Sequence, residues 1–205
     1  PMREVLRDHM HKIDASDVLA TLNIEKGKYM LLSAHREENI DLEENFMSLM
    51  ESVNQIAEKY GMPIIYSMHP RSKKFIENRN FQFHPLVRSM TPFGFSDYNC
   101  LQKNAYCVLS DSGTLSEESA MLDFPGVLIR TSTERPEVLD KGTVVVGGIK
   151  GGDVEQAVEL AVSMHRNGEQ VVMPPDYEDE NVSVKVVKII QSYAKIVNIT
   201  VWNKF

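Results

Sequence analysis

A short polar turn, SDSGTLSEE, follows an apolar run of strand length and carries residue types that could hold an anion. Gly113 lets a ligand approach the backbone closely, and Ser112 and Thr114 can donate hydroxyls or cap the following helix. The free N–H groups at a helix start favour anions. Glu118 could accept two hydrogen bonds from a ribose diol, whereas Glu117 has the spacing of a capping box with Thr114. The alternative is an ordinary capped helix without a ligand.

Three further stretches place histidine or arginine directly after an apolar run. In SAHREEN, His35 and Arg36 either bind a phosphate or belong to an ordinary helix entry. In MHPRSKKF, His69 either contacts an anion or is a turn residue on a solvated basic surface. In IRTSTERPE, Arg135 either binds a diphosphate through charge-assisted hydrogen bonds or is neutralised by neighbouring charges.

Strand-length apolar runs alternate with helical patterns along the chain, which predicts an α/β fold with a Rossmann-like parallel sheet covered by helices on both faces. In such a sheet ligands bind beyond the carboxyl ends of the strands, so the four polar stretches should meet at one edge. The expected strands are 29–34, 63–68, 86–90, 105–110, 126–130 and 143–147. The expected helices include 42–60, 98–105, 114–122, 154–166 and 182–196.

The composition excludes several classes of function. The net charge of −7 over 205 residues argues against a general nucleic-acid or anionic-membrane surface. Cys100 and Cys107 match no metal or redox spacing, so we expect packing residues in a reducing compartment and no metal site. No apolar run reaches the roughly 18–20 residues of a membrane helix, and no signal peptide is recognisable, so a cytoplasmic location is expected.

The motifs AHREEN, MHP, SDSGTLSEE, RTSTERPE and GTVVVGG, in this order, resemble the carboxyl-terminal half of the non-hydrolysing UDP-N-acetylglucosamine 2-epimerase family. The resemblance extends from about Tyr29 to the last helix. It implies a two-domain, GT-B-like enzyme with the nucleotide between its domains, of which this chain is the UDP-binding half. The opening helical pattern, with no strand before it, also suggests a fragment. We expect a lead-in segment at 1–28, the UDP-binding domain at 29–180, and a helix at 181–205 that crosses to the missing domain.

The resemblance implies a role for each residue that matches a family motif. The UDP contacts would be His35, Ser112, Gly113 and Arg135 at the diphosphate, Glu118 at the ribose and Tyr98 beside the uracil. Arg36 and His69 would contact a second, allosteric UDP-sugar. The acid and base carboxylates would belong to the first domain, no cofactor is implied, and the full-length protein would be a homodimer.

The implied reaction is loss of UDP across C1–C2 of a UDP-2-acetamido sugar, followed by re-addition after the C2 proton has changed face. Thr114 replaces the second glycine of the usual DSGG motif, and PFGFSDYNCLQ also departs from the plain epimerases. Both departures resemble the subgroup that forms UDP-N-acetyl-L-fucosamine for capsule and O-antigen polysaccharides. Two alternatives stay open: a GT-B glycosyltransferase with a similar UDP pocket, and a non-catalytic nucleotide-sugar binding module.

Overall fold

Six parallel strands form the centre of the computed structural model, which describes residues 2–168 and 172–204. Their order is β3-β2-β1-β4-β5-β6, and each strand pairs in parallel with its neighbours. The strands are β1 (Met30–Ser33), β2 (Ile64–Ser67), β3 (Val87–Met90), β4 (Cys107–Ser110), β5 (Gly126–Leu128) and β6 (Val144–Val146). The order reverses between β1 and β4, where Ser33 pairs with Ser110, and such a switch point is where open α/β sheets bind ligands.

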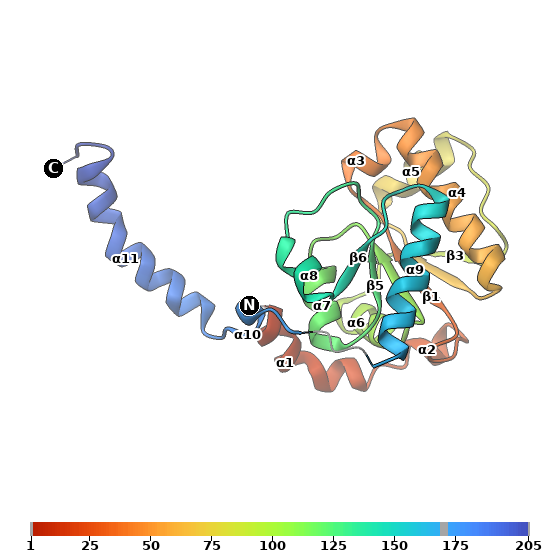
Figure 1. Cartoon of the computed structure of the whole chain (residues 1–205), viewed down its shortest axis with the longest axis horizontal. Coiled ribbons are helices and arrows are strands. Elements are labelled where there is room, and N and C mark those ends of the chain that lie inside the picture. Colours follow the sequence, from red (N-terminus) through yellow and green to blue (C-terminus); the bar gives the residue numbers. More distant parts are fainter. Residues whose placement is uncertain (1, 169–171, 205) are drawn as a thin grey trace.

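Helices cover both faces of the sheet, which confirms the expected fold class (Figure 1). One face carries α3 (Glu37–Ile40), α4 (Glu43–Tyr60), α5 (Pro70–Asn78) and α9 (Gly151–Arg166). The other carries α1 (Met2–Asp14), α2 (Val18–Thr21), α6 (Phe95–Asn104), α7 (Leu115–Leu122) and α10 (Pro175–Glu178). The short helix α8 (Pro136–Lys141) precedes β6.

The two faces follow from the alternation of side chains along each strand. Met30 and Leu32 point into the core that contains Phe46 of α4, whereas Leu31 between them points into the core that contains Leu6 of α1. All five side chains are at most 2% exposed. A strand apolar at every position is what a sheet buried on both faces requires.

The last helix, α11 (Val182–Thr200), projects away from this body beyond α10, as Figure 1 shows. None of its residues is buried, and its exposed apolar side chains include Val186, Ile189, Ile190 and Tyr193. No helix in the described part of the chain is long and apolar enough to cross a membrane.

Candidate functional site

The candidate site lies at the carboxyl edge of the sheet, across the switch point. Its centre is Asp111, which follows β4 and is completely buried. The Asp111 Oδ2 accepts hydrogen bonds from the backbone N–H groups of His35 at 2.8 Å and Arg36 at 2.9 Å, and from Asn39 Nδ2 at 3.2 Å. Because His35 and Arg36 follow β1 and Asp111 follows β4, these hydrogen bonds connect the loops that follow the two central strands.

The two histidines expected at the site lie near each other at this edge. His35 Nδ1 lies 3.2 Å from Asp111 Oδ1, and the His35 side chain is 44% exposed. The His69 ring centroid is 6.2 Å from that of His35. His69 Nδ1 accepts the backbone N–H of Arg71 at 3.2 Å and thereby caps α5. The imidazole of His69 is therefore both a helix cap and a neighbour of His35.

Two guanidinium groups converge on the turn after β4. A methyl group placed on Gly113 would lie 3.5 Å from Arg135 Nε and 4.0 Å from Arg36 Nη2. Both arginines donate only, and the N-terminus of α7 begins two residues later. The backbone at Gly113 thus lies in a concentration of positive charge suited to a diphosphate.

The expected capping box at α7 is wrong. Thr114 is the N-cap residue, but its side chain makes no capping hydrogen bond; its hydroxyl lies 2.9 Å from Ser112 Oγ instead. Glu117 forms an ion pair with Arg135. The Glu117 carboxylate therefore pairs with the Arg135 guanidinium and does not cap α7.

Glu118 lies in the first turn of α7 and is 7% exposed. Its Oε2 accepts a hydrogen bond of 2.6 Å from Gln102 Nε2, while Gln102 Oε1 is buried without a hydrogen-bond partner. Burial raises the pKa of Glu118, although hydrogen bonds from Gln102 and Thr114 act in the opposite direction. Tyr98 belongs to α6, which packs against α7. Burial and then the Glu118 charge raise the pKa of the Tyr98 phenol. The structure thus brings the expected ribose and uracil residues together.

The charges of the β5 exit partly satisfy one another. Arg130 is 3% exposed and donates to Glu38 at 2.9 Å and to Glu134 at 2.6 Å and 3.0 Å. Glu134 also accepts from Arg36 at 3.1 Å. The hydrogen bond from Arg130 is the main reason that the pKa of Glu134 falls to about 2. Arg130 is therefore occupied by Glu38 and Glu134, whereas Arg135 lies beside Gly113.

Four contributors received no role from the sequence: Asp111, Asn39, Gln102, and Tyr177, whose hydroxyl lies 3.5 Å from Arg135 Nη1. Asp111 and Asn39 stand inside the quoted motifs, so a search for buried partners of strand-exit N–H groups could have singled them out. Gln102 closes the quoted stretch PFGFSDYNCLQ, but no pattern there indicates that it contacts Glu118. Tyr177 comes from α10, which is remote in sequence, and no local pattern marks it.

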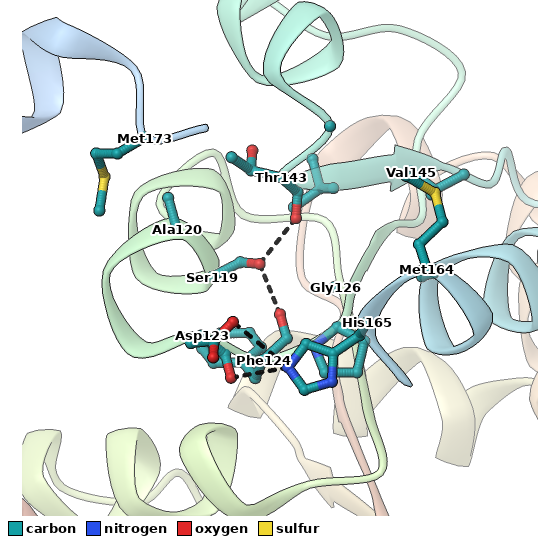
Figure 2. Close-up of a pocket in the computed structure, with 14 residues that line it drawn as sticks. Ser119, Ala120, Asp123, Phe124, Gly126, Thr143, Val145, Met164, His165 and Met173 are labelled. Carbon is teal, nitrogen blue, oxygen red and sulfur yellow. Dashed lines mark hydrogen bonds and ion pairs between the residues drawn. The ribbon is translucent and has the colours of Figure 1, made fainter. Parts of the chain in front are cut away.

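A separate cavity of about 220 Å³ lies where β5 and β6 begin, at the opposite edge of the sheet (Figure 2). The Ser119 hydroxyl lies 2.7 Å from the Phe124 carbonyl and 2.9 Å from the Thr143 carbonyl there. His165 Nε2 lies 3.4 Å from Asp123 Oδ1. The cavity shares no residue with the candidate site.

Replacing Glu118 with glutamine is expected to raise the free energy of unfolding at pH 7 by about 1 kcal/mol, because the new amide can donate to the unpartnered Gln102 Oε1. Burial raises the pKa of Glu118 in the folded state above its ordinary value of 4.5. The protonated carboxyl therefore stabilises the fold fully at a pH below 4.5, and this stabilisation is lost as the pH rises through the folded-state pKa. The advantage of the variant should therefore shrink on acidification. Urea unfolding at pH 7 and pH 4.5 measures this, with exposed Glu44→Gln as the control. A variant less stable than the parent at pH 7 would contradict it.

Comparisons with known proteins agree with this geometry. A family model described as UDP-N-acetylglucosamine 2-epimerase matches residues 1–191. The UDP-N-acetylglucosamine 2-epimerase of Methanocaldococcus jannaschii is 34% identical over 143 residues, covering 68% of this chain and 39% of the relative. The Methanococcus maripaludis enzyme is 35% identical over 144 residues, again covering 68% and 39%. This chain therefore spans about two fifths of these curated relatives.

Solved structures cover more of the chain. The UDP-N-acetylglucosamine 2-epimerase from Rickettsia bellii superposes with a TM-score of 0.81 at 36% identity, covering 99% of this chain and 54% of that one. The Methanocaldococcus jannaschii enzyme, solved in complex with UDP-GlcNAc and UDP, gives a TM-score of 0.76 at 27% identity, covering 90% and 51%. The match extends over nearly the whole chain in sequence and in fold. The chain belongs to the UDP-N-acetylglucosamine 2-epimerase family.

Proposed function

We propose that this chain is the UDP-binding half of a non-hydrolysing UDP-sugar 2-epimerase that interconverts C2 epimers of a UDP-2-acetamido sugar. The observation that carries the proposal is the convergence of Arg135 and Arg36 on Gly113, at the start of the helix that carries the buried Glu118. A diphosphate on the turn would place its ribose within reach of the carboxylate. The complex of the Methanocaldococcus jannaschii relative with UDP-GlcNAc and UDP supports this choice of ligand.

In the proposed reaction this half of the enzyme stabilises the leaving group. When the C1–O bond breaks, negative charge accumulates on the β-phosphate of UDP. The Arg135 guanidinium, the His35 imidazole, the Ser112 hydroxyl and the Gly113 N–H group would already be arranged around that charge, which lowers the barrier to elimination and to the reverse addition. Removal and return of the C2 proton are assigned to carboxylates of the other half.

The finer assignments are part of the same proposal. Arg36 and His69 would contact a second, allosteric UDP-sugar at the exits of β1 and β2, and the whole protein would form a cytoplasmic homodimer. The exposed apolar side chains of α11 would pack against the other half of the enzyme. Thr114, in place of the second DSGG glycine, favours a substrate of the UDP-N-acetyl-L-fucosamine route in polysaccharide synthesis.

Full-length protein incubated with a UDP-2-acetamido sugar in D₂O, without any acceptor, is expected to form the C2 epimer and to incorporate deuterium at C2. UDP-N-acetylglucosamine and UDP-2-acetamido-2,6-dideoxy-L-talose should be compared as substrates by ¹H NMR. The isolated 205-residue chain is expected to give no turnover, since it lacks the proposed acid and base groups.

Three results would count against this function. Epimerisation by the isolated chain would contradict the proposal that the acid and base carboxylates belong to the other half of the enzyme. Turnover that begins only after an acceptor is added would indicate a glycosyltransferase. UDP binding without turnover of any UDP-2-acetamido sugar by the full-length protein would indicate a non-catalytic module.

A further inference from the structure

The guanidinium of Arg135 is held at one nitrogen by two different elements. Its Nη1 forms an ion pair with Glu117 of α7 and lies 3.5 Å from the Tyr177 hydroxyl of α10. On the opposite side of the group, Nε lies 3.5 Å from the position that a methyl group on Gly113 would take. Within the described residues, neither Nε nor Nη2 has a hydrogen-bond partner. The Nε–Nη2 edge, which can bind an anion through two parallel hydrogen bonds, thus has no hydrogen-bond partner among the described residues, and its Nε lies beside the turn.

The hydroxyl of Tyr177 is oriented by a second contact. The Tyr177 residue is 8% exposed, and its Oη lies 3.1 Å from Glu137 Oε1. A carboxylate can only accept a hydrogen bond and a guanidinium can only donate, so the hydroxyl donates to Glu137 and turns a lone pair toward Arg135. Burial raises the pKa of Tyr177 to about 12, which keeps the hydroxyl protonated at neutral pH.

We propose that Glu117 and Tyr177 are positioning residues that direct the Nε–Nη2 edge of Arg135 at the diphosphate of the bound nucleotide. The inference rests on the proposed function, because it takes Arg135 as a diphosphate ligand. An arginine side chain has several rotatable bonds, and fixing Nη1 before binding removes much of the ordering cost that the nucleotide would otherwise meet. The two side chains act through Arg135 and need not contact the ligand themselves.

Tyr177 also connects the site to the segment that leads into α11. The turn between α10 and α11 is fastened to α1, because Glu4 Oε1 accepts the Asn181 N–H at 3.1 Å and Arg7 Nη1 lies 2.8 Å from Glu180 Oε2. The direction of the Arg135 guanidinium is therefore linked to the position of α10 against α1.

Titration of UDP into the chain and its variants by calorimetry tests the inference, with uridine titrated by NMR as the ligand that lacks phosphate. Tyr177→Phe is expected to weaken UDP binding about three- to tenfold, because it loses a contact to the guanidinium, and Glu117→Gln about tenfold, because a neutral amide replaces the charged partner of the ion pair. Uridine affinity should stay unchanged in both. Tyr29→Phe is the matched control, since it removes a buried hydroxyl that donates to the Leu101 carbonyl at 2.6 Å, and its UDP affinity should equal that of the parent.

The possible outcomes are distinguishable. UDP binding that is unchanged or tighter in Glu117→Gln and Tyr177→Phe would overturn the inference and would mean that the ion pair competes with the nucleotide. An equal loss of UDP and uridine affinity would also overturn it, since it would indicate general damage. If Arg135→Ala itself leaves UDP affinity unchanged, the proposed nucleotide site fails, and the inference fails with it. If Arg135→Ala weakens UDP and the other two variants do not, the inference alone fails.

Discussion

Replacing Asp111 with alanine is expected to lower the free energy of unfolding by about 3–5 kcal/mol. The Asp111 carboxylate is completely buried and accepts three N–H groups from the segment that follows β1. Removing it leaves the buried Asn39 amide and two part-buried backbone N–H groups without their acceptor. Asp111→Asn keeps one acceptor oxygen and should cost less than half as much.

Chemical unfolding followed by circular dichroism measures this loss. Asp140→Ala is the matched control, since the Asp140 side chain is 73% exposed and its replacement should change stability by no more than about 0.5 kcal/mol. If Asp111→Ala were as harmless as the control, the carboxylate could not be the fastening between the two strand exits.

Replacing Arg135 with alanine is expected to weaken UDP binding about 10- to 100-fold, which corresponds to about 1.4–2.8 kcal/mol. The change removes the charge whose Nε lies beside Gly113 and leaves the Glu117 carboxylate without its cation, so an anion at the turn would meet repulsion in place of attraction. Uridine affinity should be nearly unaffected, and the salt dependence of UDP binding should decrease.

Calorimetric titration at two ionic strengths measures both effects. Arg166→Ala is a suitable control, because Arg166 ends α9 and stacks on the Tyr106 ring at 4.9 Å, so it also removes one guanidinium. Equal UDP affinities for the parent and Arg135→Ala would place the diphosphate elsewhere.

The fold was predictable to a large extent because most of the strands are predominantly apolar and are separated by clear helical patterns. All six lie inside their expected ranges. Helix starts were less predictable. The expected helix at 154–166 begins earlier, at Gly151. The expected helix at 98–105 begins earlier, at Phe95.

The site was predictable as a set of strand exits, because parallel strands present their carboxyl ends at one edge. The pairing of side chains within it was not. Glu117 was expected to cap its own helix, but the fold brings Arg135 beside it. Gln102 reaches Glu118 from the preceding helix, and Tyr177 reaches Arg135 from α10. Which side chains pair depends on which strands lie next to each other in the sheet, and β1 and β4 are adjacent there although they are far apart in the sequence.

The place of β1 in the sheet also has a consequence for the order in which the chain can fold. β1, β2 and β3 are consecutive in sequence and adjacent in space, so they can pair through successive short crossovers. β4 must instead return past both and pair with β1, which closes a much longer loop at a larger entropic cost. Asp111 follows β4, and its hydrogen bonds to His35 and Arg36 can form only after β4 has paired with β1. A half-formed sheet therefore lacks the complete candidate site, which the chain acquires only when β4 has paired with β1.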